Sequence, residues 1–386
     1  MKKKVTIFGS TGSIGLSTLD IINQHSDKYE IVGLSINNNY EKLLEQVSTF
    51  KPKIVSIRDS KSFEKFKNKN TLKNLKILNG YDSFDDILDY ETDIVVAAIT
   101  GSAGLLPVVG AVKRGITIAL ANKESLVCSG SLVTSLAKKN GSMILPVDSE
   151  HNAIYQVLDL KNKNNVSKLI LTASGGPFLN KKLDEMKNIT PEQAVKHPNW
   201  SMGKKISVDS ATMMNKGLEL IEAHYLFDMP HEKIEIVVHP ESIIHSCVEY
   251  SDGSILAQMG NPDMRTPISY TLAYPNRIPT HVEKLKLSEI KKLTFYEPDF
   301  KRFPCLELAY SSLKIKKSAP TILNAANEIA VDAFLRDQIS FLSIHKVVEK
   351  TLNKASISSI NSIKDVVEID TESRKIAKEF IRLHRI

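Results

Sequence analysis

The stretch VTIFGSTGSIGLSTLDIINQH, residues 5–25, decides the fold of the first part of the chain. It joins an apolar segment typical of a buried strand, a glycine-rich turn and the opening of a helix, and a second strand, EIVGLSI, follows at residues 30–36. Gly9, Gly12 and Gly15 recur every three residues, a spacing that lets the backbone bend sharply and approach a pyrophosphate. In this context the motif predicts dinucleotide binding at the helix N-terminus. The alternative is a tight strand–helix turn that binds no ligand.

The end of the second strand indicates which dinucleotide binds. NAD sites place an Asp or Glu there to hold the ribose 2′-hydroxyl. This chain instead reads Ser35, Ile36, Asn37, Asn38 and Asn39, without a carboxylate. Because a loop without acid tolerates a 2′-phosphate, the sequence favours NADPH.

Further apolar segments alternate with helical patterns; they read PKIVSI, LKIL, DIVVAAI and ITIALAN. This alternation predicts an α/β fold with a doubly wound, largely parallel sheet. Asn122, Lys123 and Glu124 follow the last of these strands, and ligands of open parallel sheets lie beyond the carboxyl ends of the strands. We therefore expect the triplet to contact a nicotinamide and a polyol. The alternative is a plain helix start with Glu124 in its first turn.

Three carboxylates are candidates for metal binding. Asp148 and Glu150 follow the strand-like segment ILPV, and residues i and i+2 of an extended chain point the same way. Glu219 lies on a helical stretch, about 100° around the axis from an arc of apolar residues. Hard oxygen ligands suit Mg²⁺ or Mn²⁺. The alternative has Asp148 as an N-cap and Glu219 as a solvated helix residue. The apolar arc consists of Met214, Leu218, Ile221 and Tyr225.

The middle of the chain offers anion-binding groups. Ser174 opens the glycine loop SGG, and Ser210, Asn215 and Lys216 gather donors near a helix start, as a phosphate cradle would. The only tryptophan, Trp200, lies in HPNWSMGKK, which is too polar for a core. We expect an exposed aromatic on a mobile lid there. The alternative is a surface tryptophan partly covered by a neighbour.

Length and composition limit the functional classes. The 386 residues suffice for two or three domains, with 42% hydrophobic and 25% charged residues. The net charge of +7 is spread over lysine-rich segments without interleaved stacking aromatics, so we expect no nucleic-acid binding. No apolar stretch approaches membrane-spanning length, and no signal peptide or organelle presequence is recognisable. Scattered cysteines indicate a reducing compartment, and we expect a cytoplasmic protein; they are Cys128, Cys247 and Cys305.

The rest of the chain reads as structural. Strand patterns continue through EIVVHPESIIHSCVEY, where His239 and His245 lack a matching ligand partner and are interpreted as structural. A linker rich in proline and short polar stretches spans residues 274–299. The clearest helices beyond it are APTILNAANEIAVDAFL and the closing ESRKIAKEFIRLHRI.

Taken together, these motifs resemble the 1-deoxy-D-xylulose 5-phosphate reductoisomerase family. The matching runs extend over nearly the whole chain; they are GSTGSIG, ANKESLV, LPVDSEHNAI, ASGGPF, HPNWSMGKKISVDSATMMNKGLELIEA, VHPESIIHS, GNPDMRTPI and LNAANEIAV. In the family the loop after the second strand often reads Gly-Lys-Asn, where this chain has Asn37, Asn38 and Asn39. That departure leaves open how the 2′-phosphate is contacted.

The resemblance implies roles for individual residues. The metal ligands are Asp148, Glu150 and Glu219, and the catalytic residues are Lys123, Glu150 and Glu219. Substrate contacts are implied for Lys123, Ser149, Glu150, Ser174, His197, Trp200, Ser210, Asn215, Lys216 and Glu219. Cofactor contacts are implied for Thr11, Gly12, Ser13, Ile14, Asn38, Asn39, Asn122, Glu124 and Gly203. Trp200 and Met202 lie on the segment that resembles the family's flexible lid.

The resemblance also implies an organisation and an activity. An NADPH-binding Rossmann-like domain would span 1–148, a catalytic, metal-binding and dimerisation domain 149–273 with a lid near 195–205, a linker 274–299, and a helical domain 300–386. The implied reaction is the rearrangement and NADPH-dependent reduction of 1-deoxy-D-xylulose 5-phosphate, with Mg²⁺ or Mn²⁺, by a homodimer. The residues alone leave two alternatives: a semialdehyde dehydrogenase or reductase without rearrangement, and a non-catalytic NADPH-sensing regulator.

Overall fold

The computed structural model describes residues 1–80, 83–159, 161–200 and 202–384. Contacts divide the chain into two compact units. Unit 1 comprises Met1–Ser125, Val133–Ser149 and Met264–Val282. Unit 2 comprises Leu126–Leu132, Glu150–Asp263 and Glu283–Ile386. Within the described ranges, no helix has the length and apolar character needed to cross a bilayer.

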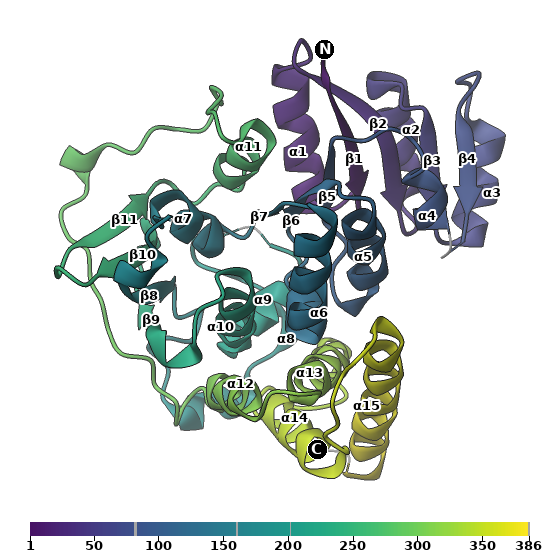
Figure 1. The fold of residues 1–386 in the computed structure, drawn as a ribbon. Coiled ribbons are helices and arrows are strands. Elements are labelled where there is room, and N and C mark those ends of the chain that lie inside the picture. The colour runs from purple at the N-terminus through teal and green to yellow at the C-terminus, as the bar shows by residue number, and fades with distance from the viewer. Residues whose placement is uncertain (81–82, 160, 201, 385–386) are drawn as a thin grey trace. The chain divides into compact units, whose positions relative to one another are not determined.

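Unit 1 is built on a seven-stranded parallel sheet in the order β4-β3-β2-β1-β5-β6-β7 (Figure 1). The strands are β1 (Lys3–Phe8), β2 (Tyr29–Ile36), β3 (Ile54–Ile57), β4 (Lys76–Asn79), β5 (Ile94–Ala97), β6 (Thr117–Leu120) and β7 (Ile144–Pro146). The chain runs outward from β1 to β4 and then returns to β5, which pairs with the other side of β1. The order therefore reverses between β1 and β5, the position at which doubly wound sheets bind dinucleotides.

Helices connect these strands, as the alternating sequence pattern predicted. They are α1 (Ser13–Gln24), α2 (Tyr40–Phe50), α3 (Ser60–Lys69), α4 (Ser83–Ile87), α5 (Leu105–Lys113) and α6 (Glu124–Asn140), with a 3₁₀ turn at Ser102–Gly104. The apolar faces of helix and strand share one core, in which Ile7 and Leu34 from the sheet meet Leu19 and Ile22 from α1. The α/β fold class with a doubly wound parallel sheet is confirmed.

One helix of unit 1 comes from late in the sequence. Helix α11 (Arg265–Ala273) packs against α1, β6 and β7, and its Ile268 and Leu272 are buried in the unit 1 core. The side chain of Lys3 donates to the carbonyl of Leu272 at 3.2 Å, and the ring of His25 bonds the carbonyl of Pro279 at 2.7 Å. Residues 264–282, divided by the sequence prediction between a central domain and a linker, thus belong to the unit that contains β1.

Unit 2 contains a four-stranded sheet in the order β11-β10-β8-β9 and most of the remaining helices (Figure 1). Its strands are β8 (Val166–Ala173), β9 (Ile234–Val238), β10 (Ile244–Tyr250) and β11 (Ile255–Met259). β8 and β9 are parallel, and β10 is antiparallel to both β8 and β11. The helices are α7 (Ser149–Val157), α8 (Pro191–Ala194), α9 (Lys204–Ala211), α10 (Met214–Leu226), α12 (Pro304–Ile315), α13 (Ala319–Leu335), α14 (Ser343–Lys354) and α15 (Ile363–His384). Short 3₁₀ turns lie at Lys163–Asn165, Leu183–Asn188, His231–Lys233 and Leu287–Glu289.

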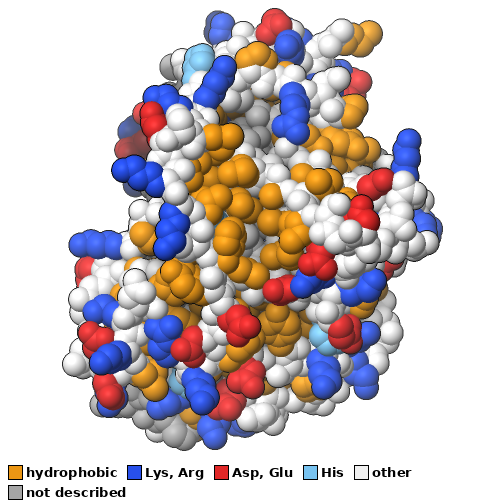
Figure 2. All heavy atoms as spheres, turned by 90° about the vertical axis from the view of Figure 1, so that its left-hand side faces the viewer, with side chains coloured by type: hydrophobic (Ala, Val, Ile, Leu, Met, Phe, Trp, Pro, Cys, Tyr) orange, Lys and Arg blue, Asp and Glu red, His pale blue; other side chains and the backbone are white. Residues whose placement is uncertain are grey.

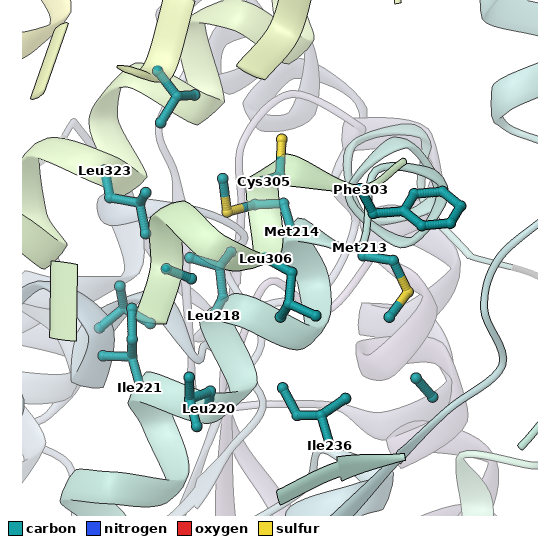
Figure 3. Close-up of a cluster of buried hydrophobic side chains, with 14 of the residues drawn as sticks. Met213, Met214, Leu218, Leu220, Ile221, Ile236, Phe303, Cys305, Leu306 and Leu323 are labelled. Carbon is teal, nitrogen blue, oxygen red and sulfur yellow. The ribbon is translucent and has the colours of Figure 1, made fainter. Parts of the chain in front are cut away.

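Helix α10 is fixed in unit 2 by its apolar arc. Met214, Leu218 and Ile221 are fully buried, and Figure 3 shows them in one cluster with side chains of α12 and β9. Gly217 lets α12 approach closely, since a Cβ added there would lie 2.5 Å from the Cβ of Ala309. Truncating a buried leucine such as Leu218 in a core of this kind costs about 2–5 kcal/mol. The helix that carries Glu219 is therefore held rigidly.

The helices expected near the end of the chain are present. α13 has the bounds Ala319–Leu335 that the sequence predicted, and α15 begins earlier than the predicted closing helix, at Ile363. The last two residues of that predicted helix, 385 and 386, lie outside the described residues. In this division the C-terminal helices belong to the same unit as β8–β11, so a separate helical domain at 300–386 stays a prediction.

Candidate active site

The glycine turn of unit 1 has the geometry of a dinucleotide loop. Gly9 has φ +87°, and a Cβ there would lie 2.7 Å from the carbonyl oxygen of Ala98. A Cβ on Gly15 would lie 2.5 Å from the carbonyl oxygens of Gly9 and Ser10, so only glycine lets α1 pack this tightly on the turn. Gly12 occupies the N-cap of α1 without a side-chain cap. The predicted cofactor residues Thr11, Gly12, Ser13 and Ile14 all lie on this turn and the first residues of α1.

The loop after β2 is exposed and carries three amides. Asn37, Asn38 and Asn39 are all exposed to solvent. The side chain of Asn39 accepts a hydrogen bond from the backbone N–H of Lys42 at 3.2 Å and so caps α2. Asn39 therefore stabilises the start of α2, whether or not it also contacts a cofactor. Asn38 lies one residue earlier, on the exposed loop between β2 and α2.

The triplet after β6 is buried and internally bonded. Asn122 donates to the carbonyls of Ile99 and Gly101 at 2.7 and 2.8 Å and to Glu124 at 3.1 Å. Lys123, only 5% exposed, forms an ion pair with Asp148 at 2.5 Å. Glu124 begins α6, so the helix-start interpretation also describes this segment. The carboxyl ends of β6 and β7 thus bring a buried ammonium and a carboxylate together.

In unit 2 a single ammonium lies between two of the predicted metal ligands. Lys216 Nζ donates to Glu150 Oε1 at 2.8 Å and to a carboxylate oxygen of Glu219, and oxygens of Glu150 and Glu219 lie within 4.8 Å of each other. Glu219 is 1% exposed and also accepts from Asn215 Nδ2 at 2.5 Å. The interpretation of Glu219 as a solvated residue is wrong. So is the extended chain expected from Asp148 to Glu150, because α7 begins at Ser149 and Glu150 lies in its first turn.

Two residues that sequence reasoning missed brace this pair. His151, next to Glu150 on α7, is fully buried, and its Nε2 bonds the backbone carbonyl of Glu219 at 2.9 Å. Its Nδ1 lies 3.4 Å from a carboxylate oxygen of Glu222, which is also fully buried. Two features of the sequence could have indicated these residues: His151 directly follows Glu150, and Glu222 lies on the same arc of α10 as Glu219. These contacts fix α7 against α10 and so set the spacing of Glu150 and Glu219.

His197 and Ser174 form a second polar group in unit 2. The backbone N–H groups of Asn199 and Trp200 both donate to His197 Nδ1 at 3.1 Å. The ring proton is therefore on Nε2, which donates to Ser174 Oγ at 2.9 Å. Burial lowers the pKa of His197, against a smaller opposing effect of the charge on Glu150. His197 is thus a neutral ring that positions a serine hydroxyl.

The segment expected to be a lid is partly packed. Trp200 is half-buried rather than exposed, and its ring lies 6.0 Å from the ring of His245. This agrees with the alternative interpretation, in which a neighbour partly covers the tryptophan. Asn199 Nδ2 donates to the carbonyl of Pro240 at 2.7 Å and to Ser242 Oγ at 3.0 Å. Residue 201, within the predicted lid at 195–205, lies outside the described residues. Met202 is half-buried, and Gly203 is the exposed N-cap of α9.

His239 is structural, as expected. It is fully buried, and its Nε2 accepts from the backbone N–H groups of Ile243 and Ile244 at 3.2 Å. Its Nδ1 bonds the carbonyl of Thr294 at 2.9 Å, which ties the segment after residue 283 to the turn between β9 and β10.

The remaining predicted donors lie at the corner between α9 and α10. Ser210 is on the last turn of α9, Met213 has the left-handed φ of +60°, and α10 then begins with Asn215 and Lys216 in its first turn. A Cβ on Gly176 would lie 2.7 Å from the carbonyl oxygen of Ser210, so the SGG loop packs directly on this corner. Ser174, Ser210 and the start of α10 are therefore assembled in one region of unit 2.

Comparison with known proteins identifies the family. Three family models match, described as 1-deoxy-D-xylulose 5-phosphate reductoisomerase over residues 5–130, its C-terminal domain over 144–227, and a DXP reductoisomerase C-terminal domain over 259–376. A 1-deoxy-D-xylulose 5-phosphate reductoisomerase of Chlorobium phaeovibrioides is 50% identical, covering 98% of this chain and 99% of that protein. The chain belongs to the 1-deoxy-D-xylulose 5-phosphate reductoisomerase family. A relative of that name from Geobacillus sp. is 48% identical over 98% of this chain and all of its own length.

Solved structures of the reductoisomerase family have the same fold. The enzyme of Zymomonas mobilis in complex with NADPH superposes with a TM-score of 0.93 at 46% identity, covering 99% of both chains. A reductoisomerase in complex with NADPH, fosmidomycin and magnesium gives 0.95 at 44% identity, covering 99% of this chain and 98% of that one. Membership of the reductoisomerase family thus holds for sequence and fold along the whole chain.

The cysteines of this reductoisomerase family member are unsuited to nucleophilic catalysis. Cys128, Cys247 and Cys305 are all buried. Burial raises the pKa of Cys247 to about 11 and that of Cys305 to about 12, so both are protonated thiols at neutral pH. The thiolate is the nucleophilic form. A dehydrogenase that works through a cysteine nucleophile therefore has no support from these two residues.

Proposed function

We propose that this protein converts 1-deoxy-D-xylulose 5-phosphate to 2-C-methyl-D-erythritol 4-phosphate, with NADPH and a divalent metal ion, in non-mevalonate isoprenoid biosynthesis. Family membership over the whole chain supports the reaction. The observation that carries the proposal is the pairing of the half-buried Glu150 and the buried Glu219 around one cationic group, on a chain that also has the dinucleotide loop at the sheet reversal.

The residues present fit a divalent cation. Glu150 and Glu219 already hold one positive charge, the ammonium of Lys216, and a nearly fully buried carboxylate such as Glu219 needs such a partner. Asp148 stands two residues before Glu150, so the chain itself keeps a third carboxylate close. We assign Asp148, Glu150 and Glu219 as ligands of Mg²⁺ or Mn²⁺, ions that prefer such oxygen donors. The bound ion supplies electrophilic polarisation of the substrate carbonyl.

The residues present also fit NADPH. The glycine turn leaves the N-terminus of α1 without a side-chain cap, as a site for the pyrophosphate requires. The absence of acid from residues 37–39 suits a 2′-phosphate. We assign the cofactor to the turn residues Thr11, Gly12, Ser13 and Ile14 and to Asn38, Asn39, Asn122, Glu124 and Gly203. NADPH supplies the hydride.

The chain's own groups then bind and orient the substrate. Ser174, with its oxygen already accepting from His197 and Gly176, keeps its own hydrogen to donate to a phosphate oxygen. Ser210, Asn215 and Lys216 complete that phosphate site, and Ser149 and Lys123 contact the reacting end. Lys216 leaves the carboxylates for the phosphate when the cation binds. Trp200 closes over the substrate and excludes water.

Lys123 and Glu150 are assigned the proton and charge movements. As a carbon–carbon bond of the ketose migrates, a hydroxyl proton leaves and a new carbonyl forms; Glu150 is placed to carry that proton. The hydride then adds to the resulting aldehyde, and its oxygen takes up one proton, so that one NADPH is oxidised for each product formed. Lys123, whose ammonium is buried, stabilises the developing oxyanion. Remote binding of the phosphate holds the reacting atoms in place.

A homodimer is part of the proposal. β11 is an edge strand, and hydrophobic side chains gather on the face that carries it (Figure 2). Ile255 and Leu256 on β11 are 54% and 48% exposed, and Tyr296 is 55% exposed. Unpaired strand edges with exposed apolar side chains are sites of association. We assign this face to a second copy of the chain, and we place the protein in the cytoplasm.

The assay that tests the function follows NADPH oxidation with 1-deoxy-D-xylulose 5-phosphate, with and without Mg²⁺ or Mn²⁺. The proposal predicts oxidation that requires both the sugar phosphate and the ion, with 2-C-methyl-D-erythritol 4-phosphate as product. A reductase without rearrangement gives an unbranched product, and an NADPH-sensing regulator binds NADPH without oxidising it. Either result overturns the proposal.

A further inference from the structure

A buried carboxylate lies directly beside the corner between α9 and α10. This corner, which carries the proposed phosphate-binding residues Ser210, Asn215 and Lys216, is called the phosphate corner below. Asp209, adjacent to Ser210 on the last turns of α9, is only 1% exposed. Lys205 Nζ lies 2.8 Å from Asp209 Oδ2, and Asn327 Nδ2 donates to Asp209 Oδ1 at 2.8 Å. The backbone carbonyl of Asp209 also accepts from Thr212 Oγ1 at 3.2 Å. Each oxygen of this residue therefore has a partner, and the partners come from two different helices and the α9–α10 corner.

Burying Asn327 at this point of the core lowers the stability of the fold. It lies on α13 within the LNAANEIAV motif and is fully buried. Its Oδ1 makes no hydrogen bond with any residue in the described part of the chain. A buried amide with an unmet acceptor destabilises a core relative to an apolar side chain of similar size. Asn324 on the same helix has an unmet Oδ1 too, so what singles out Asn327 is its contact with Asp209, next to Ser210.

We propose that Asn327 is a positioning residue for the phosphate end of the substrate, acting through Asp209. This inference rests on the proposed function, in which Ser210, Asn215 and Lys216 bind the phosphate. Asp209 is covalently next to Ser210, and the SGG loop packs on the carbonyl of Ser210 through Gly176. Asn327 thus fixes the rotation of α9, and with it the hydroxyl of Ser210 and the start of α10. A small shift at such a corner has large effects, because misplacement by about 1 Å can cost on the order of 10²-fold in rate.

The chain offers a matched control on the same helix. Asn324 is also fully buried on α13, and its Nδ2 donates to Glu328 Oε1 at 3.0 Å rather than to α9. Asn324→Leu and Asn327→Leu therefore make the same chemical change one turn apart. A merely structural role predicts similar effects for both variants on unfolding and on every kinetic constant.

The kinetic test compares these two variants with the wild-type enzyme. Asn327→Leu should raise KM for 1-deoxy-D-xylulose 5-phosphate about tenfold, equivalent to losing roughly one good hydrogen bond to the phosphate. KM for NADPH should change less than KM for the sugar phosphate, since the proposed cofactor contacts other than Gly203, at the N-cap of α9, lie in unit 1. Asn324→Leu should leave both constants near wild type. Equal increases in KM for the sugar phosphate in both variants overturn the proposal.

A second readout separates this inference from the proposed function. Inorganic phosphate, compared with chloride at equal ionic strength, should raise the Tm of the wild type and of Asn324→Leu but not that of Asn327→Leu. This measurement needs no turnover, so it tests the corner even if the sugar phosphate is not a substrate. If Asn327→Leu does not fold, Asn327→Ser, whose shorter hydroxyl does not span the contact, takes its place. A phosphate-dependent increase in Tm that survives in the Asn327 variant contradicts the positioning role.

Discussion

Lys216 Nζ bridges Glu150 and Glu219, lying 2.8 Å from Glu150 Oε1 and in contact with a carboxylate oxygen of Glu219. The side chains of Lys216 and Glu219 are 4% and 1% exposed and that of Glu150 is 19% exposed, so these charges balance one another with little help from solvent. In the proposed metal site, a divalent cation between these carboxylates would take over this balance and release the ammonium. The same side chain can therefore serve the carboxylates before binding and the substrate phosphate afterwards.

Lys216→Ala tests this exchange. Without a divalent cation, the two carboxylates lose their counter-charge, and we expect the free energy of unfolding to fall by about 3 kcal/mol. Saturating Mg²⁺ should recover most of that loss and raise the Tm of the variant more than that of the wild type. KM for the sugar phosphate should rise at least about tenfold, since a charged contact is lost. Lys168→Ala, which removes a half-exposed pair with Glu235, is the control for both measurements. A KM at the wild-type value removes Lys216 from the phosphate site.

Glu219→Gln tests the metal assignment in kinetics. The amide keeps the size and the acceptor oxygen but loses the charge that a dication needs. We expect kcat to fall by about 10² or more and the Mg²⁺ concentration for half-maximal activity to rise. Glu235→Gln, on the exposed side of β9, should leave both unchanged. Wild-type kinetics at low Mg²⁺ would exclude Glu219 from the ligand set.

Two glycine substitutions separate folding from cofactor binding in the β1–α1 turn. A Cβ on Gly15 meets backbone oxygens at 2.5 Å, so Gly15→Ala should lower the free energy of unfolding by about 2 kcal/mol or more. A Cβ on Gly12 meets only one atom, at 3.4 Å, so Gly12→Ala should fold with a Tm near wild type. Its methyl group should nevertheless obstruct the pyrophosphate and raise KM for NADPH about tenfold or more. Normal NADPH kinetics in Gly12→Ala would contradict the placement of the cofactor.

Asn38→Asp tests the preference for NADPH over NADH. Asn38 is exposed at the end of β2, where an acid favours a ribose 2′-hydroxyl and repels a 2′-phosphate. We expect the ratio of kcat/KM for NADPH to that for NADH to fall by about tenfold. Asn38→Ala removes the same amide without adding a charge and shows how much of any change comes from losing the Asn38 side chain rather than from the acid. An unchanged ratio in Asn38→Asp means that the 2′-phosphate lies elsewhere.

The pH dependence follows from His197. Burial lowers its pKa, so the folded protein favours the neutral ring, and the stabilisation is full above the unfolded pKa of about 6.5. It is lost as the pH falls through the lowered folded pKa, because a proton on Nδ1 breaks the bonds from Asn199 and Trp200. We expect KM for the sugar phosphate to rise as the pH falls through this lowered pKa, which lies below the ordinary value of about 6.5, and the emission of Trp200 to change with it.

Two variants test whether the pH-dependent rise in KM comes from the ring of His197. His197→Gln should remove the step in KM, whereas His245→Gln should retain it. The second variant is needed because His245 lies beside Trp200 and burial also lowers its pKa. A step in KM that survives in His197→Gln would assign it to another group.

Local patterns in the sequence predicted most of the elements but not their long-range partners. The strands of unit 1 and the bounds of α13 follow from hydrophobic periodicity and glycine or proline punctuation, which depend on neighbouring residues only. The position of α11 in unit 1 depends on contacts such as Lys3 with the carbonyl of Leu272, 269 residues apart, which no local pattern records. The onset of α7 at Ser149 agrees with the alternative that made Asp148 an N-cap, whereas the metal interpretation extended the strand-like ILPV two residues too far.

The candidate site shows the same division. Glu219 was proposed as a ligand from its place about 100° around α10 from the apolar arc, and that place did not predict its burial. The pairing of Lys216 with Glu150 required the packing of α7 on α10, which His151 and Glu222 establish. Asn327 and Asp209 lie 118 residues apart, so only the structure relates the LNAANEIAV motif to the phosphate corner.

The central claim is that Asp148, Glu150 and Glu219 hold one divalent cation in place of the Lys216 ammonium. Anomalous diffraction from crystals grown with Mn²⁺, NADPH and the sugar phosphate tests it most directly. The account predicts one anomalous peak per chain, about 2.1 Å from an oxygen of each carboxylate, with Lys216 turned to the phosphate. Two results would contradict it: an anomalous peak at another place in the protein, or no peak at all with Lys216 still lying between Glu150 and Glu219.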